Sequence, residues 1–211
     1  MFKTILEGYG EFSKNLSAAD KELFSRLSEG QSPEALLITC SDSRIVPQLF
    51  THTGPGDIFM VRNAGNIIPP CGHKGISPGD QSEMASVEYA VKHLGVRHII
   101  VCGHSDCGAM KALQSGVDQE GTPHLYHWLN HAQDTLENFK AEASSEWDEV
   151  SQLSQFNVIR QLEHLKNYKF IRERLEKDEL TLHGWFFNIS SASLYLYDEK
   201  QQNFFSLLEE E

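Results

Sequence analysis

The chain has 211 residues, of which 40% are hydrophobic and 23% are charged, and its formal net charge is −12 at pH 7. This composition is typical of a soluble folded domain, and the acidic balance argues against nucleic acid and membranes as partners, because both attract a basic face. No run approaches the ~18 apolar residues of a membrane span. The first residues contain no secretory signal pattern, so we expect a cytoplasmic protein with reduced cysteines.

The N-terminal segment predicts a helical arm over residues 1–30. Apolar side chains recur at helical spacing through residues 2–28, and the pattern ends at Gly30. Short apolar runs, rich in β-branched residues and bounded by turn residues, then predict strands at 35–39, 57–61 and 98–102.

Helical and strand patterns alternate in the rest of the chain. We expect helices at 85–94, 109–113, 125–140 and 150–177. Residues 181–189 and 193–198 predict two strands joined by a short turn, and the tail 206–211 is expected to fray. The whole predicts one α/β domain over residues 1–211. Its central, mostly parallel sheet is flanked by helices and has an antiparallel edge strand.

Two of the predicted strands end in residues that bind metals. Cys40 follows the strand at 35–39, and His104 and Cys107 follow the strand at 98–102. In an open parallel sheet, functional residues gather at the carboxyl ends of the strands. If these strands are neighbours, the three side chains meet, and two thiolates with one imidazole suit one zinc ion per chain.

Asp42 and Arg44 closely follow Cys40 in the sequence. The fourth ligand of the metal is not determined by this pattern. Water could take that position, and its pKa would then fall to roughly 7. Asp42 could instead bind the metal itself, which would permit a closed or structural site. Arg44 could hold Asp42 in a bidentate pair. A phosphate-binding cysteine loop and a nucleotide site are not supported, because their motifs are absent.

The chain resembles the β-class carbonic anhydrases, and most closely their plant-type branch with its bacterial and cyanobacterial members. The resemblance extends over nearly the whole chain. It rests on CSDSR at 40–44, the segment from 55 to 69 containing RNAGN, SVEYAV at 86–91, CGHSDCGAM at 102–110 and LHGW at 182–185.

The resemblance implies a zinc lyase that hydrates carbon dioxide reversibly to bicarbonate and a proton. Zinc would be held by Cys40, His104 and Cys107, and the dyad of Asp42 and Arg44 would orient zinc-bound hydroxide. In a closed form, Asp42 would be the fourth ligand. A homodimer is expected, with tetramers or larger assemblies left open, and the enzyme could lie in the cytoplasm, a carboxysome or another compartment.

The resemblance also implies the residues of a substrate pocket at a dimer interface. Gln31 matches a position whose side-chain amide binds substrate, and the backbone amide of Gly108 would bind a substrate oxygen. Phe59 and Tyr89 match the apolar wall of the pocket. Carbon dioxide is small and apolar, which suits a pocket of this kind.

Some positions depart from the family pattern or need a separate interpretation. Leu37 stands where a noncatalytic bicarbonate site needs tryptophan, so that regulation is not expected. The segment 71–83 is longer than usual and is expected near the mouth of the pocket. Arg62 is expected to form a structural ion pair, and Asp106 is expected to point outward.

Two rival functions remain at this stage. A zinc hydrolase acting on carbon disulfide would use the same ligands with a different entry channel. A catalytically silent scaffold or bicarbonate sensor would lack the dyad or one of the ligands, and neither is lost here.

Overall fold

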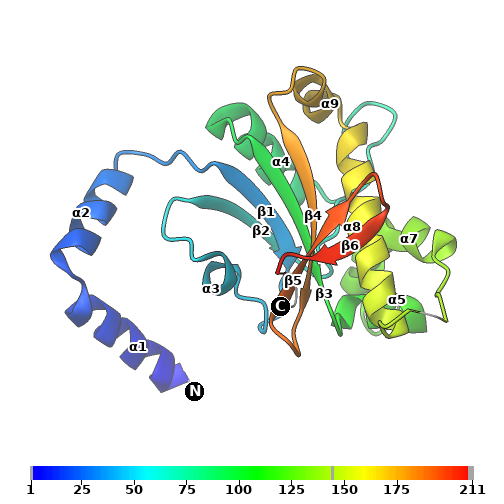
Figure 1. Ribbon diagram of the computed structural model, residues 1–211, viewed down its shortest axis with the longest axis horizontal. Coiled ribbons are helices and arrows are strands. Elements are labelled where there is room, and N and C mark those ends of the chain that lie inside the picture. Colours follow the sequence, from blue (N-terminus) through cyan, green and yellow to red (C-terminus); the bar gives the residue numbers. More distant parts are fainter. Residues whose placement is uncertain (1, 144, 209–211) are drawn as a thin grey trace. The chain divides into compact units, whose positions relative to one another are not determined.

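The computed structural model describes residues 2–143 and 145–208 (Figure 1). The chain divides into two compact units, Met1–Ser32 and Pro33–Glu211. Within the described residues, no helix has both the length and the apolar composition needed to cross a membrane. The part of the expected frayed tail at 209–211 lies outside the described residues.

The first unit consists of two helices, α1 (Phe2–Asn15) and α2 (Ala18–Leu27). The predicted arm is thus interrupted before Ser17, whose hydroxyl accepts a hydrogen bond from the backbone N–H of Asp20. The Asp20 carboxylate accepts one from the backbone N–H of Ser17 in return. This capping box starts a new helix. The exposed apolar side chains of α1 are Phe2, Ile5, Leu6, Tyr9 and Phe12.

The second unit is built on a six-stranded sheet with the order β2-β1-β3-β4-β5-β6. The strands are β1 (Ala35–Cys40), β2 (Ile58–Asn63), β3 (His98–His104), β4 (Thr181–Asn188), β5 (Ser193–Asp198) and β6 (Asn203–Ser206). Strands β1 to β4 pair in parallel, whereas β5 and β6 pair antiparallel at one edge. The predicted α/β fold is confirmed. The short β6 goes beyond the predicted strands, because four residues carry little periodicity.

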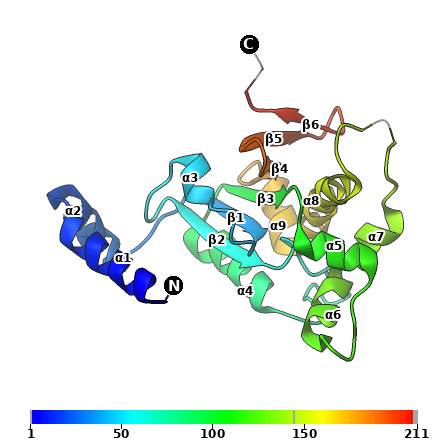
Figure 2. The same ribbon diagram turned by 90° about the horizontal axis from the view of Figure 1, so that it is seen from below.

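Helices cover one face of this sheet, as Figure 2 shows for α4, α8 and α9. They are α4 (Ser82–Tyr89) with its π-helical continuation η1 (Ala90–Leu94), α8 (Glu149–Asn167) and α9 (Lys169–Leu175). Alternate residues of β1 and β3, among them Ile38 and Val101, pack against this layer, which includes Val158 of α8. The opposite face packs Leu37 and Ile100 in a cluster with Phe50 of α3 (Pro47–Thr51).

A further group of helices packs near the carboxyl ends of the strands. These are α5 (Gly108–Ser115), α6 (Pro123–Leu129), the 3-10 turn η2 (Asn130–Ala132) and α7 (Gln133–Asn138). Their apolar residues, including Met110 and Leu129, form one buried cluster with Cys40 and Cys107. The two thiols therefore lie in a largely apolar environment.

Candidate metal centre

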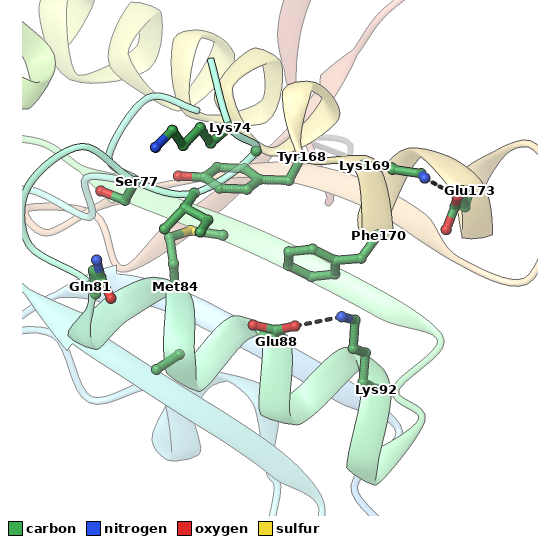
Figure 3. Close-up of a pocket in the computed structure, with 13 residues that line it drawn as sticks. Lys74, Ser77, Gln81, Met84, Glu88, Lys92, Tyr168, Lys169, Phe170 and Glu173 are labelled. Atoms are coloured by element: carbon green, nitrogen blue, oxygen red, sulfur yellow. Dashed lines mark hydrogen bonds and ion pairs between the residues drawn. The ribbon is translucent and has the colours of Figure 1, made fainter. Parts of the chain in front are cut away.

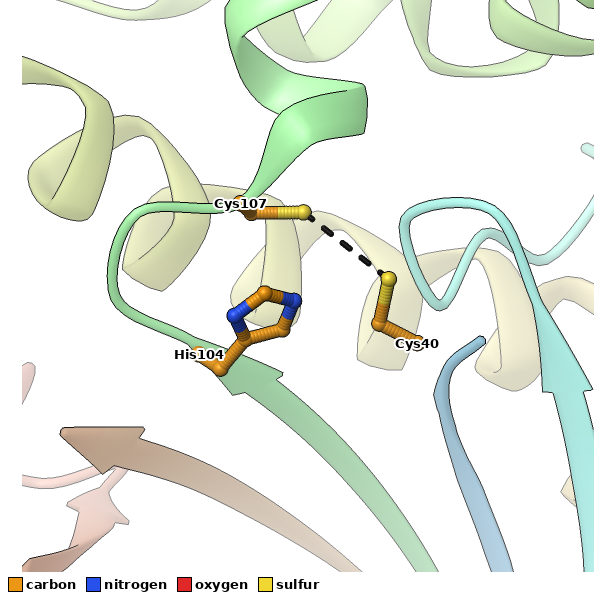
Figure 4. Close-up of side chains that lie close together, drawn as sticks. All are labelled: Cys40, His104 and Cys107. Carbon is orange, nitrogen blue, oxygen red and sulfur yellow. Dashed lines mark hydrogen bonds between the residues drawn. The ribbon is translucent and has the colours of Figure 1, made fainter. Parts of the chain in front are cut away.

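Cys40, His104 and Cys107 converge at the carboxyl ends of β1 and β3 (Figure 4). Cys40 is the last residue of β1, His104 is the last residue of β3, and Cys107 precedes the first residue of α5. Strands β1 and β3 are hydrogen-bonded neighbours, so the condition that the sequence left open is met. All three side chains are buried.

The geometry of these side chains fits a tetrahedral metal ion. The two Sγ atoms lie 4.0 Å apart, and two sulfurs bound to one zinc ion at 2.3 Å would lie about 3.8 Å apart. The Nδ1 of His104 donates to the carbonyl of Ser105 at 2.8 Å, which leaves a lone pair on Nε2. Among the described residues, this buried Nε2 atom has no hydrogen-bond partner. An unpaired buried nitrogen facing two thiols is a suitable ligand for zinc.

The two thiols have opposite pKa shifts. The interaction with Cys107 lowers the pKa of Cys40, with help from the backbone N–H of Gly65. The same pair raises the pKa of Cys107, because the negative charge of Cys40 and burial both oppose a second ionisation. Without a cation, the site therefore favours one thiolate beside one thiol, and a dication would stabilise two thiolates.

Asp42 is held by Arg44 at the edge of this centre. The Nε and Nη2 atoms of Arg44 donate to the two carboxylate oxygens of Asp42 at 2.9 and 2.8 Å, and the backbone N–H of Arg44 donates to Oδ1 at 3.0 Å. The bonds from Arg44 hold the pKa of Asp42 well below its ordinary range. The Oδ2 atom of Asp42 lies 4.0 Å from Nε2 of His104. An ionised carboxylate thus stands directly beside the ligand set.

Asp106 contacts the other side of the Arg44 guanidinium. Its Oδ2 accepts from Nη1 of Arg44 at 2.8 Å, and its backbone carbonyl accepts from Nη2 at 3.1 Å. The ammonium of Lys111 bonds to its Oδ1. The side chain of Asp106 is 52% exposed and so points outward as expected, but it also bonds to Arg44. Its left-handed backbone, with a φ of 57°, directs the side chain toward Arg44, and residue type alone does not reveal this.

Arg62 holds the backbone that carries Cys40 and Asp42. Its guanidinium donates to the carbonyl oxygens of Cys40, Asp42 and Ile45 at distances between 2.8 and 3.1 Å. Within residues 2–143 and 145–208, its partners are thus carbonyl oxygens, and the expected ion pair is not formed. The role is structural, because these bonds fix the turn that leads out of β1.

The loop after β2 supplies a hydrogen bond to one of the thiols. The backbone N–H of Gly65 donates to Sγ of Cys40 at 3.4 Å, and Nδ2 of Asn157 in α8 donates to the carbonyl of Gly65 at 3.0 Å. Gly65 has a φ of +86°, and a Cβ at this position would lie 3.0 Å from that of Ala109. Only glycine fits this close approach without strain.

Three more polar side chains, two on α8 and one directly after its last residue, hold the same loop. Gln161 accepts from the backbone N–H of Ile68 at 2.8 Å, and His164 donates to the Ile68 carbonyl at 2.7 Å. The hydroxyl of Tyr168 donates to the carbonyl of Pro69 at 2.8 Å. Asn157, Gln161 and His164 recur every three or four positions and so share one face of α8. The spacing is visible in the sequence, but the partner loop is not.

Phe59 and Tyr89 lie together but away from the metal centre of their own chain. Their ring centroids are 5.9 Å apart. Phe59 pairs in register with Leu36, which precedes Cys40 by four residues, or about 13 Å of strand. The structure therefore brings the two predicted wall residues to each other and not to the ligands of the same subunit.

The other two predicted substrate residues are placed differently. Gly108 begins α5 directly after Cys107, so its backbone N–H is one of the first in the helix and has no partner within it. A Cβ at Gly108 would meet no atom within 4 Å. Gln31 belongs to the first unit, and its role stays a prediction.

A groove of ≈ 570 Å³ lies between the segment 71–83, α4 and the junction of α8 with α9 (Figure 3). Met84, Tyr168 and Phe170 contribute apolar surface to it, and two ion pairs, Glu88–Lys92 and Lys169–Glu173, lie among the residues that line it. None of the three candidate metal ligands lines this groove. The segment 71–83 thus forms one wall of this groove, which is separate from the candidate metal centre.

The comparisons with known proteins agree with this geometry. The carbonic anhydrase family model matches residues 35–194. A carbonic anhydrase of Pseudomonas aeruginosa is 42% identical over 208 residues, covering 98% of this chain and 92% of that protein. The β-carbonic anhydrase CcaA has a structure with a TM-score of 0.87 and 38% identity, covering 97% of this chain and 98% of that chain. A chain from the crystal structures of two tetrameric β-carbonic anhydrases of Sordaria macrospora matches with a TM-score of 0.74 and 32% identity. The match covers 92% of this chain and 95% of that chain.

Proposed function

Because the chain belongs to the β-class carbonic anhydrase family, we propose that it hydrates carbon dioxide reversibly to bicarbonate and a proton at a zinc ion bound by Cys40, His104 and Cys107. The convergence of these three buried ligand atoms within 4.8 Å of one another carries the proposal. Three protein ligands leave the fourth position of a tetrahedral site for chemistry.

A zinc ion held by these three residues would supply hydroxide as the nucleophile at neutral pH, because such a site lowers the pKa of water to roughly 7. Asp42 accepts a hydrogen bond from the nucleophile's O–H and thereby turns an oxygen lone pair toward the substrate carbon. Arg44 keeps Asp42 ionised and correctly oriented, which the bidentate contact between them supports. This dyad is the proposed catalytic pair.

The attack places negative charge on an oxygen of the substrate. The backbone N–H of Gly108 lies at the start of α5, next to Cys107, where a free N–H and the helix dipole favour a negative charge. The side-chain amide of Gln31 is proposed as a second donor. Both donors would act without becoming charged themselves, so they suit a neutral substrate.

The enzyme is further proposed to be a homo-oligomer with a substrate pocket shared between subunits. Phe59 of β2 lies level with the residue four positions before Cys40, and Tyr89 of α4 packs against it. Neither lies at the metal centre of its own chain, which supports a contribution from a second copy. β2 is an edge strand of the sheet, and an unpaired edge commonly joins another chain. The apolar side chains exposed on α1 offer further surface to a partner, and the Sordaria macrospora relatives are tetrameric.

The proposal is tested by stopped-flow measurement of carbon dioxide hydration on zinc-loaded protein. Cys107→Ala should lose zinc and activity together. Asp42→Asn should keep its zinc and lose activity by roughly a hundredfold, the lower end for a positioned proton-transfer group. Asp198→Asn, at an exposed turn where the carboxylate accepts backbone N–H bonds, is the matched control and should behave as wild type.

The outcomes separate the rival functions. Full activity in Asp42→Asn would show that the dyad assignment is wrong. If zinc-loaded wild-type protein hydrolysed carbon disulfide but hydrated no carbon dioxide, carbon disulfide would be the substrate in place of carbon dioxide. Protein that binds one zinc ion per chain and turns over neither substrate would support a scaffold or sensor in place of an enzyme.

A further inference from the structure

The guanidinium of Arg44 is held from two sides by two carboxylates. Asp42 accepts hydrogen bonds from Nε and Nη2 of Arg44 but none from Nη1. Asp106 takes Nη1 at 2.8 Å, and its backbone carbonyl adds a second bond to Nη2 at 3.1 Å. The polar nitrogens of the guanidinium are thus all engaged, and a planar group bonded on two edges cannot rotate without breaking bonds.

The orientation of Arg44 matters because of what Asp42 could do without it. The Oδ2 atom of Asp42 lies 4.0 Å from Nε2 of His104. A carboxylate that turned from Arg44 toward the three candidate ligands could join them, because carboxylate oxygens bind zinc well. Among the residues that the structure describes, the hydrogen bonds that hold this carboxylate all come from Arg44, including one from its backbone N–H.

We propose that Asp106 is a positioning residue, which fixes Arg44 so that Asp42 faces the arginine rather than the metal ligands. The inference rests on the proposed function of the dyad. Asp106 acts through Arg44 and does not itself contact the ligand set. Its φ of 57° brings both its carboxylate and its carbonyl to one guanidinium, which an ordinary surface ion pair does not require.

The contact should affect the site more than the fold. The side chains of Arg44 and Asp106 are 43% and 52% exposed, and pairs this exposed contribute little to global stability. Lys111 bonds to the far oxygen of Asp106 and does not touch Arg44, so it provides a matched control. Loss of Lys111 removes an ion pair of Asp106 but leaves both of its bonds to the guanidinium.

The test compares Asp106→Gly, Asp106→Asn and Lys111→Met in zinc-loaded protein. Glycine accepts the left-handed backbone and removes the carboxylate, whereas asparagine accepts that backbone and keeps a carbonyl oxygen for Nη1. In Asp106→Gly, kcat should fall about fivefold, near the upper limit for an exposed pair, with KM and zinc content unchanged. Asp106→Asn should restore most of kcat, and Lys111→Met should stay within about twofold of wild type.

A second measurement reads the arginine directly and does not depend on turnover. Nitrogen-15 relaxation of the Arg44 Nε–H, assigned by its absence in Arg44→Lys, should give an order parameter that falls below about 0.6 in Asp106→Gly. It should stay high in wild type and in Lys111→Met. An unchanged order parameter in Asp106→Gly, or an equal loss of kcat in Lys111→Met, would overturn the inference. If the wild type hydrated no carbon dioxide, the proposed function would fail, and the order parameter would still decide the role of Asp106.

Discussion

Replacing Asn157 with leucine removes one of the hydrogen bonds that hold the loop after β2 against α8. The side chain of Asn157 is fully buried, donates to the carbonyl of Gly65 and accepts from Nε2 of Gln161 at 2.8 Å. The hydroxyl of Thr135 also donates to Oδ1 of Asn157 at 3.4 Å. Leucine has a similar volume but removes the bonds to all three partners. Each buried polar group left unpaired costs about 1–3 kcal/mol, and added apolar contacts offset about 1 kcal/mol. The free energy of unfolding should therefore fall by roughly 3 kcal/mol.

The same substitution should weaken metal binding, because Gly65 donates to Sγ of Cys40. Loss of a partner outside the ligand set typically lowers metal affinity 10–100-fold, so we expect about tenfold here. Urea unfolding at fixed protein concentration measures the first effect, and competition with a chelator measures the second. Asn138→Leu is the matched control, since this exposed side chain bonds only within α7, and it should change stability by less than about 0.5 kcal/mol.

Two results would refute this reasoning. An Asn157→Leu protein of unchanged stability would mean that the hydrogen bonds between α8 and the loop contribute nothing net. A destabilised protein with unchanged zinc affinity would mean that the position of Gly65 does not affect the thiolate. Destabilisation by Asn138→Leu of the same size would show that the loss is not specific to the loop.

Gly103→Ala should destabilise the fold by about 1–3 kcal/mol, because the added Cβ would lie 2.7 Å from Cγ2 of Val158 and 3.0 Å from Oγ of Ser154. Thermal unfolding measures this loss. Asp134→Asn should cost about 1 kcal/mol at pH 7. Burial opposes ionisation of Asp134, but the interactions with Arg160 and His164 together outweigh it and lower the pKa. This stabilisation is present above the unfolded pKa and is lost as pH falls through the folded one, so urea unfolding curves of variant and wild type should converge below about pH 4.

An Asp134→Asn variant whose destabilisation persisted unchanged at low pH would point to shape rather than charge as the cause. For Gly103→Ala, wild-type stability would mean that β3 and α8 can separate without cost. The backbone N–H of His104, next to Gly103, donates to Oγ of Ser154 at 3.3 Å. Weaker zinc binding in Gly103→Ala is therefore also expected.

Periodicity predicted the main elements but not the positions where helices break. The helical pattern over 150–177 continues through Tyr168, yet the structure ends α8 before this residue and starts α9 after it. Tyr168 is buried, and its hydroxyl is bonded to the loop after β2. A tertiary contact therefore decides this break, since the local pattern favours an unbroken helix. Ser17 is a contrasting case, because its break follows from a capping box that the sequence contains.

The sequence by itself indicated five of the six strands, named the three side chains that converge at their carboxyl ends, and placed Asp42 within reach of Arg44. Buried parallel strands need continuous apolar runs, which a sequence displays. The carboxyl ends of such strands share one edge of the sheet. Asp42 and Arg44 are two residues apart after a strand, which keeps their side chains within reach of each other. Only the tertiary structure decided that Asp106 turns toward Arg44 and that α8 holds the loop beside Cys40. The first depends on the sign of one backbone angle, and the second joins segments 92 residues apart. Packing settles both, because short-range spacing carries no information about either.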